Sequence, residues 1–139
     1  MVEPLAVFDT NVIVSGFLSP HGPPGRIVEW LRQGAVRAAV DDRVVAEYDA
    51  VLKRPEFRLP PAEVEIVLGA ILSHAVWAEV TPGCLPAGPP DPDDRPFAEC
   101  AVAAGCPLVT GNLRHFPAKA LGVTVLSPAQ FVALTGVPG

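Results

Sequence analysis

Three carboxylates and one amide, carried by distant segments of the chain, are of the types that bind hard metal ions. Asp9 directly follows the apolar run Leu5–Phe8, where a charge is costly to bury unless it is paired or bound to metal. The other candidates are Glu47, Asp94 and Asn112. Carboxylates that lie close together repel one another unless they share protons or bind a cation. Because all of these ligands are oxygen atoms, the sequence predicts a site for Mg²⁺ or Mn²⁺.

Each acid also has a simpler structural role, which stays open at this point. Asp9 could cap the helix or turn that follows it. Glu47 lies at the border of an apolar helical stripe, so it either points into a cleft or is solvated. Asp94 projects toward the packed side of the next helix, whereas Asp91 and Asp93 are typical of a capped helix start. Only the combination of the three acids favours a metal site over these separate roles.

Short β-branched runs alternate with helical periodicity, which is the pattern of a parallel α/β sheet. We expect strands at residues 5–8, 36–40, 75–80, 107–110 and 123–126, and helices at residues 25–34, 41–54, 60–72, 93–104 and 128–134. Residues 81–92, rich in proline and glycine, are expected to form a loop. Ligands of such sheets bind outside the carboxyl ends of the strands. Two of those ends carry Asp9-Thr10-Asn11 and Thr110-Gly111-Asn112, so these polar residues are expected at one edge of the sheet.

The composition limits the possible functions. The chain is 50% hydrophobic with a mean hydropathy of +0.36, which excludes intrinsic disorder and predicts one domain over residues 1–139. Fifteen acidic against ten basic residues give a net charge of −5, which argues against a general electrostatic binder of nucleic acids or membrane surfaces. An enzyme that carries its positive charge as metal is not excluded, since two divalent cations would bring −5 to −1.

The sequence shows no signal for export or membrane insertion. The N-terminus lacks the basic, apolar and small-residue regions of a signal peptide. The uncharged segment 120–139 is interrupted by glycine and proline, so we expect a strand and a short helix there rather than a membrane span. Three cysteines without a C-x-x-C spacing disfavour both a disulfide framework and a structural zinc site. A cytoplasmic protein with no membrane partner is expected.

Over about residues 6–131, the motifs resemble those of the PIN domains (named after the PilT N-terminus), a family of metal-dependent nucleases. The run Val7–Val12 is similar to the family's first motif, in which the aspartate, Asp9 here, ligates metal and the asparagine, Asn11 here, supports the site. Glu47 is similar to the family's second acid, and Asp94 is similar to its third acid. The run Val109–Asn112 is similar to the family's fourth motif.

The fourth motif departs from the family pattern, because Asn112 stands where most PIN domains have aspartate. An amide oxygen can ligate a cation but supplies no negative charge, which weakens a second metal site more than the first. Ser15 and the stretch Ser19–Pro24 resemble a subgroup described as toxin components of toxin–antitoxin systems, in which asparagine is frequent at this position.

The resemblance implies a three-layer α/β/α domain with a central parallel sheet and an activity that hydrolyses RNA phosphodiester bonds. It implies that Mg²⁺ or Mn²⁺ is held by Asp9, Glu47 and Asp94, and that the site is supported by Asn112, Asn11, Thr110, Arg95, Arg114 and Ser15. An antitoxin protein and a second copy of the chain, as a homodimer, are the implied partners beside RNA. His115 is either a general acid or a solvated turn residue.

Two other classes of function stay open. A PIN-like module that binds RNA or protein without cleaving it is favoured by Asn112 and would bind no Mn²⁺. A doubly wound phosphatase or phosphotransfer domain also places acids at strand ends, but it requires a lysine near the phosphate or a nucleophilic aspartate. Lys53 and Lys119, the two lysines of the chain, do not lie at a predicted strand end.

Overall fold

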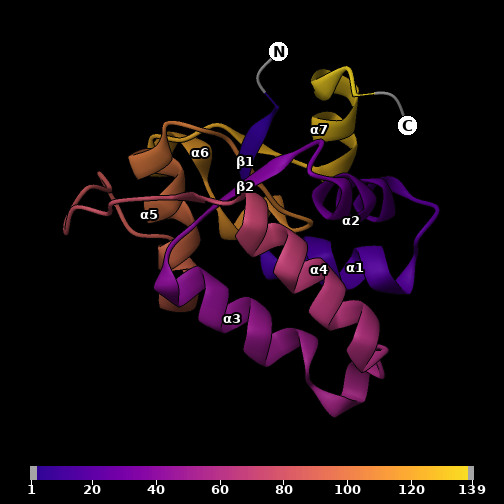
Figure 1. Ribbon diagram of the computed structural model, residues 1–139. Coiled ribbons are helices and arrows are strands. Elements are labelled where there is room, and N and C mark those ends of the chain that lie inside the picture. The colour runs from indigo at the N-terminus through magenta and orange to yellow at the C-terminus, as the bar shows by residue number, and fades with distance from the viewer. Residues whose placement is uncertain (1–2, 138–139) are drawn as a thin grey trace.

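The fold is built on a parallel β-sheet, seen in a computed structural model that describes residues 3–137 (Figure 1). Five strands pair in the order β3-β2-β1-β4-β5, and every pairing is parallel. The strands are β1 Leu5–Phe8, β2 Arg37–Val40, β3 Val76–Trp77, β4 Leu108–Val109 and β5 Val125–Leu126. The prediction of a central parallel sheet is confirmed.

The outer strands are shorter than the sequence predicts. The expected strand at residues 75–80 is reduced to β3, although the backbone N–H of Ala78 still donates to the Val40 carbonyl at 2.8 Å. Likewise, the N–H of Thr110 donates to the Leu126 carbonyl at 3.0 Å, one residue beyond the end of β4. The chain leaves β3 toward the proline-rich segment 81–92, where proline cannot donate to a ladder.

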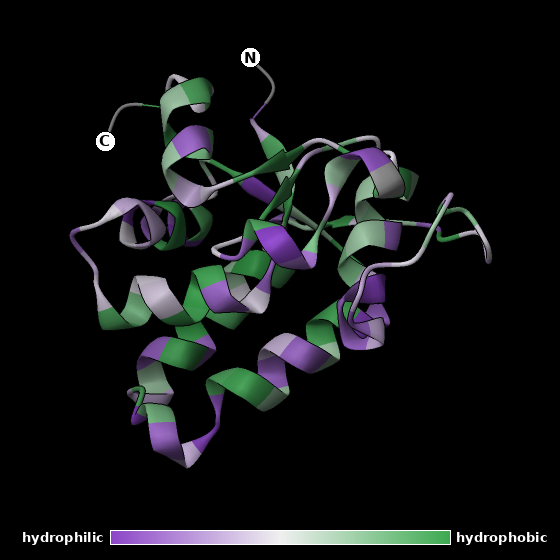
Figure 2. Cartoon of the chain, turned by 180° about the vertical axis from the view of Figure 1, so that it is seen from behind, coloured by the Kyte–Doolittle hydropathy of each residue, from purple (hydrophilic) through white to green (hydrophobic). Residues whose placement is uncertain are grey.

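The two longest strands are buried on both faces, as expected for central strands of a parallel sheet. Ala6, Val7 and Phe8 of β1 have no exposed surface, and Ala38–Val40 of β2 are equally buried. Consecutive apolar residues, rather than alternating ones, are favoured because helices cover both faces of the sheet. Figure 2 shows the strands in the green of hydrophobic residues, with purple hydrophilic residues on the outer helices.

Helices cover the sheet on two faces and complete the three α/β/α layers (Figure 1). The helices are α1 Thr10–Leu18, α2 Pro23–Gln33, α3 Asp42–Leu52, α4 Pro61–His74, α5 Arg95–Ala104, α6 Ala118–Leu121 and α7 Pro128–Thr135. On one face α2 packs against α1, α4 and α7, and on the other face α5 packs against β1, β2 and β4. Helix α3, which begins where β2 ends, contacts both α1 and α5.

Two helices, α1 and α6, have no counterpart among the predicted elements. Helix α1 contains the β-branched run Val12–Val14, which has low helix propensity. All three of these residues are buried, so tertiary packing outweighs the local preference. Gly16 lets α2 approach closely, because a Cβ atom there would lie 2.3 Å from Val28 Cγ2 and 2.7 Å from the Pro24 carbonyl oxygen.

Aspartate caps begin the helical segments that border the carboxyl edge of the sheet. Asp41 accepts a hydrogen bond of 3.0 Å from the backbone N–H of Val44 at the start of α3. Asp91 accepts one of 2.9 Å from the N–H of Asp93, at the start of the 3₁₀ helix Pro92–Asp94 that leads into α5. The capping role predicted for Asp91 is confirmed, and α5 begins at Arg95, within the predicted start at about residues 93–95.

The uncharged C-terminal segment forms β5 followed by α7, as predicted, and residues 138–139 lie outside the described residues. Ser127 and Gln130 form a capping box at the start of α7, in which each side chain accepts a hydrogen bond from the other residue's backbone N–H. Over residues 3–137, no helix has both the length and the apolar composition needed to cross a membrane.

Candidate functional site

The candidate site lies where the strand order of the sheet reverses. β1 pairs with β2 on one side and β4 on the other, and open α/β sheets bind ligands at such a point. Asp9 follows β1 and Thr110 follows β4, and Thr110 Oγ1 donates a hydrogen bond of 2.8 Å to Asp9 Oδ2. Asp9 is 7% exposed and Thr110 is fully buried. The ends of two neighbouring strands therefore fix the position of one buried aspartate.

A second contact joins the same two loops. The backbone N–H of Gly111 donates to Asn11 Oδ1 at 3.1 Å, and the N–H of Asn112 donates to Thr110 Oγ1 at 3.1 Å. Asn11 therefore holds the loop after β4 against the start of α1.

Asp9 is the N-cap residue of α1, yet its side chain makes no capping hydrogen bond. Burial has the largest effect on the carboxyl group and raises its pKa. The hydroxyl of Thr110 and the backbone N–H groups of Thr10 and Asn11 oppose this effect, but they leave the pKa of Asp9 above its ordinary value. The ionised carboxylate therefore carries an electrostatic cost that a bound cation would offset.

Asp94 is the second carboxylate of the site. Its side chain is 15% exposed, and its Oδ2 is buried without a hydrogen-bond partner among residues 3–137. The Nδ1 of His115 lies 3.3 Å from this oxygen. Burial and then the negative charge of Asp9 raise the pKa of Asp94 to about 6, against a smaller opposing effect of His115. Because the charge of Asp9 acts on Asp94, the two residues are described below as the acidic pair.

Glu47 stands apart from the acidic pair. It is exposed on α3 and forms no ion pair with residues 3–137. The next residue, Tyr48, is buried and its hydroxyl donates to the carbonyl of Phe8, the residue before Asp9. This hydrogen bond fixes helix α3 against the end of β1. Glu47 is the residue before Tyr48, which makes this contact.

The other predicted site residues differ in burial. Ser15, Arg95 and Arg114 are exposed, whereas Asn112 is half-buried beside Thr110. Within residues 3–137, no three side chains of His, Cys, Asp or Glu are grouped closely enough to hold a metal ion. Within these residues, Glu47 therefore does not form a three-ligand group with Asp9 and Asp94.

The sequence interpretation missed an ion-pair network next to the site. Glu99 on α5 is 5% exposed and accepts a hydrogen bond of 2.8 Å from Nη1 of Arg43. The same guanidinium donates to Asp41 Oδ2 from Nε and Nη2, at 2.9 and 2.7 Å. One signal was present in the sequence, because Glu99 is the single charged residue within the otherwise apolar stretch Phe97–Ala101.

The donor set of the acidic pair suits a hard divalent cation. Mg²⁺ is usually held by one or two carboxylates while waters complete its coordination. Among residues 3–137 Asp94 Oδ2 is buried without a hydrogen bond, and the pKa values of both aspartates stay raised although His115 lies 3.3 Å from this oxygen, so a cation would offset charge here. The amide of Asn112 offers a further neutral oxygen near Thr110.

Comparison with known proteins agrees with the fold. Among solved structures, VapBC2 from Rickettsia felis bound to a DNA fragment from their promoter contains a chain similar to this one, with a TM-score of 0.54 and 17% sequence identity. The similarity covers 88% of this chain and 98% of that chain, and at this identity it shows the fold alone. No curated protein matches the chain. The sequence model of the PIN domain matches residues 6–114, most of the chain, and the chain therefore belongs to the PIN domain family.

Proposed function

We propose that the protein is a metal-dependent endoribonuclease that hydrolyses RNA phosphodiester bonds. PIN domains are generally nucleases, and the observation that carries the proposal is the acidic pair. Asp9 lies at the edge of the sheet where ligands bind and its charge acts on Asp94, which has a buried carboxylate oxygen without a hydrogen bond among the described residues. A divalent cation would supply the positive charge that this arrangement lacks.

In this proposal Asp9 and Asp94 hold Mg²⁺ or Mn²⁺, and Glu47 is the third acid of the site. The hydrogen bond from Thr110 occupies Asp9 Oδ2, which leaves Oδ1 available to the ion. Glu47 is exposed, so it acts through water, as is common around Mg²⁺. When bound, the cation activates water for attack and offsets negative charge on the scissile phosphate.

The protein's own residues position this chemistry. Thr110 accepts a hydrogen bond from the N–H of Asn112 and donates one to Asp9, so the orientation of its hydroxyl is fixed. Asn11 fixes the loop after β4 through Gly111. Because Asn112 supplies an oxygen without charge, the proposal assigns one strongly held cation rather than two.

Positive side chains at the same edge would bind the RNA backbone. Arg114 and His115 follow Asn112, and Arg95 follows Asp94 in the sequence. A guanidinium donates two parallel hydrogen bonds to a phosphate group, which suits the arginines to this role. Ser15, exposed on α1, is proposed as a further polar contact to the substrate.

The partners are proposed from the fold. A chain of similar fold belongs to a VapBC toxin–antitoxin complex, and we propose that this protein is the toxin of such a pair, with an antitoxin protein as its partner. A homodimer is a further proposed assembly. RNA is proposed as the substrate, because the resemblance of the sequence motifs favours it.

One observation favours a second function, that of a PIN-like module which binds RNA or protein without cleaving it. Glu47 stands apart from the acidic pair and Asn112 replaces the fourth acid, so the site carries less charge than four carboxylates would provide. Calorimetric titration with Mn²⁺ separates the two functions, because a non-catalytic module would release no heat of metal binding.

The test of the proposed function is cleavage of an RNA pool by the purified protein with Mg²⁺ or Mn²⁺. Asp94→Asn should lower cleavage at least about 100-fold, since it removes a carboxylate that holds the ion. Asp93→Asn is the matched control, because Asp93 is the adjacent residue and its side chain is exposed. Equal cleavage by the wild-type protein and Asp94→Asn would exclude the acidic pair as the catalytic site.

A further inference from the structure

An open cavity of about 440 Å³ lies where α3 and α5 begin, and Val80, Pro82 and Gly83 of the loop after β3 form part of its lining. Its volume is within the range of about 300–1,000 Å³ that is typical of small-ligand sites. Its charged lining residues are Asp41, Arg43, Arg95 and Glu99. Arg95 directly follows Asp94, so the cavity adjoins the acidic pair along the chain. The charges of the two guanidinium groups and the two carboxylates balance, so the lining carries no net charge.

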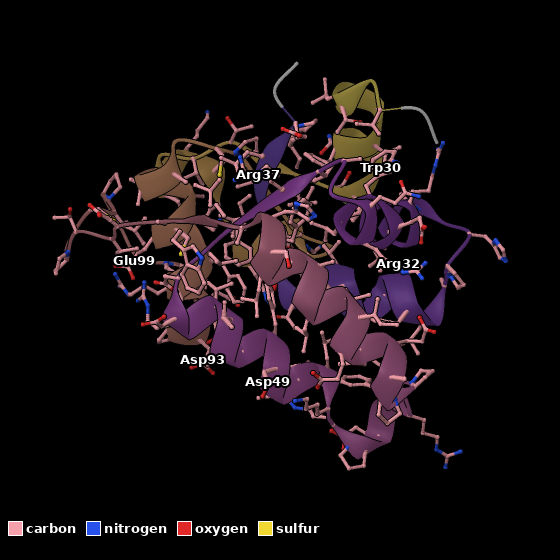
Figure 3. All side chains as sticks on the ribbon, viewed as in Figure 1. Trp30, Arg32, Arg37, Asp49, Asp93 and Glu99 are labelled. Carbon is pink, nitrogen blue, oxygen red and sulfur yellow. The ribbon has the colours of Figure 1, made fainter. Side chains whose placement is uncertain are left out.

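Glu99 presents a hydrogen-bond acceptor to this cavity. Its side chain is only 7% exposed, and Oε1 accepts the hydrogen bond from Arg43 Nη1. No hydrogen bond from residues 3–137 reaches Oε2. Figure 3 shows Glu99 on α5 beside the beginning of α3. Oε2 is not among the buried oxygen atoms that lack a partner, so it stays accessible, and a ligand that donates a hydrogen bond can reach it.

Two of the four charged residues, Asp41 and Arg43, already form hydrogen bonds within the protein. Asp41 caps α3 through Val44 and accepts two hydrogen bonds from Arg43. Arg43 in turn holds Oε1 of Glu99. These contacts fix the position of Glu99, and they leave its Oε2 and the guanidinium of Arg95 as the groups that can bind a ligand.

Arg95 is the available cation of the cavity. It forms no ion pair with any residue from 3 to 137. Its guanidinium rests against the loop before α5, because a Cβ atom added to Gly88 would lie 2.3 Å from Arg95 Nη2. Arg95 therefore lines the cavity while its guanidinium rests against a glycine rather than against a carboxylate.

We propose that this cavity binds one nucleotide of the RNA substrate beside the cleaved bond and selects bases that carry an exocyclic amino group. The inference rests on the proposed function and adds a base preference to it. The amino group of cytosine, adenine or guanine donates to Glu99 Oε2, and Arg95 contacts the adjoining phosphate. Uracil is disfavoured, because two carbonyl oxygens flank its single ring N–H and would face the carboxylate.

The test is a titration of the metal-free wild-type protein with cytidine 5′-monophosphate and uridine 5′-monophosphate, followed by backbone NMR. The two probes differ at C4 of the base, where cytosine has an amino group and uracil an oxygen. We expect shifts centred on Arg43, Arg95 and Glu99, and an affinity for the cytidine nucleotide that is about fivefold or more higher. Equal affinities, or shifts outside the cavity, would overturn the proposal.

Two variants test the separate roles proposed for Glu99 and Arg95. Glu99→Gln should remove the difference between the two nucleotides, because the amide can both donate and accept. Arg95→Gln should weaken both nucleotides to a similar degree, because it removes the phosphate contact alone. A base preference that persists in folded Glu99→Gln contradicts the assignment, and if that variant does not fold, the wild-type comparison still decides.

This experiment is separate from the test of the proposed function, because it needs neither metal nor cleavage. If the protein shows the nucleotide preference but cuts no RNA, the nucleotide site is supported and the proposed activity is refuted. If the protein cuts RNA and binds both nucleotides equally, the proposed activity is supported and the nucleotide site is refuted.

Discussion

Thr110 Oγ1 donates a hydrogen bond of 2.8 Å to Asp9 Oδ2 and so joins two residues that lie 101 positions apart in the sequence. They follow β1 and β4, the neighbouring strands between which the sheet order reverses. The same hydroxyl accepts a hydrogen bond from the N–H of Asn112. One buried side chain therefore orients the carboxylate proposed to hold the metal and the loop that carries the amide.

Thr110→Val should weaken both metal binding and stability. Valine has the same shape but removes the donor to Asp9, and loss of a residue that orients a metal ligand typically reduces affinity about 10- to 100-fold. Leaving the buried carboxylate without this donor should cost about 1–3 kcal/mol. Calorimetry with Mn²⁺ and urea unfolding measure the two effects. Thr110→Ser, which keeps the hydroxyl, should restore metal affinity to within a few-fold, and failure to do so would contradict the role of this hydrogen bond.

Asp94→Asn should stabilise the metal-free protein at neutral pH. The folded-state pKa of Asp94 is raised from 3.8 to about 6, so the folded state binds more protons than the unfolded state between these values. The contribution of this group to stability is therefore present at low pH and is lost as the pH rises through about 6. Because solvent screens part of the charge, the gain at pH 7.5 should be about 1 kcal/mol, or about 4 °C in melting temperature.

The measurement is thermal unfolding from pH 4.5 to 7.5 in the presence of a chelator. Asp93→Asn should change the pH dependence much less than Asp94→Asn, because the exposed Asp93 has the smallest of the named effects on the pKa of Asp94. Addition of Mn²⁺ should reverse the order, because the wild-type protein gains stability by binding the ion and Asp94→Asn gains less. A metal-free Asp94→Asn protein that melts below the wild type at pH 7.5 would show that the acidic pair is not under electrostatic strain.

The edge of the sheet that carries the site could be predicted because it depends on local patterns. A consecutive apolar run ending in a polar triplet marks both β1 with Asp9 and β4 with Thr110, and burial on both faces requires such runs. The inward direction of Asp94 also follows from its place relative to Phe97 at the start of α5. These features need no knowledge of distant contacts.

The remaining features depend on contacts between distant segments. A helical projection places Glu47 at the border of an apolar stripe, but it does not show whether a neighbour covers that border, and the structure leaves Glu47 exposed. The pairing of Glu99 with Arg43 joins residues 56 positions apart. Helix α1 forms against the propensity of Val12–Val14, because these residues are buried by α2 and other elements.

Gly16→Ala should destabilise the protein, whereas Gly69→Ala should not. An added Cβ atom at Gly16 would lie 2.7 Å from the Pro24 carbonyl oxygen, so α1 and α2 must separate, at a cost of about 1–3 kcal/mol. Gly69 lies in the middle of α4 with no atom within 4 Å of an added Cβ, so alanine should stabilise the helix by about 0.5–1 kcal/mol. Urea unfolding of both variants tests this packing. A Gly16→Ala protein that is as stable as Gly69→Ala would refute it.

Glu47→Gln distinguishes a third acid of the metal site from a solvated surface residue. Because Glu47 is exposed, its replacement should change the free energy of unfolding by no more than about 0.5 kcal/mol. If it acts on the ion through water, Mn²⁺ affinity and RNA cleavage should both fall about tenfold or more, as for other groups that support a metal from outside its direct ligands. Glu56→Gln, another exposed acid in the 3₁₀ helix Pro55–Phe57, is the matched control and should change neither quantity. Wild-type cleavage by Glu47→Gln would restrict the metal site to Asp9 and Asp94.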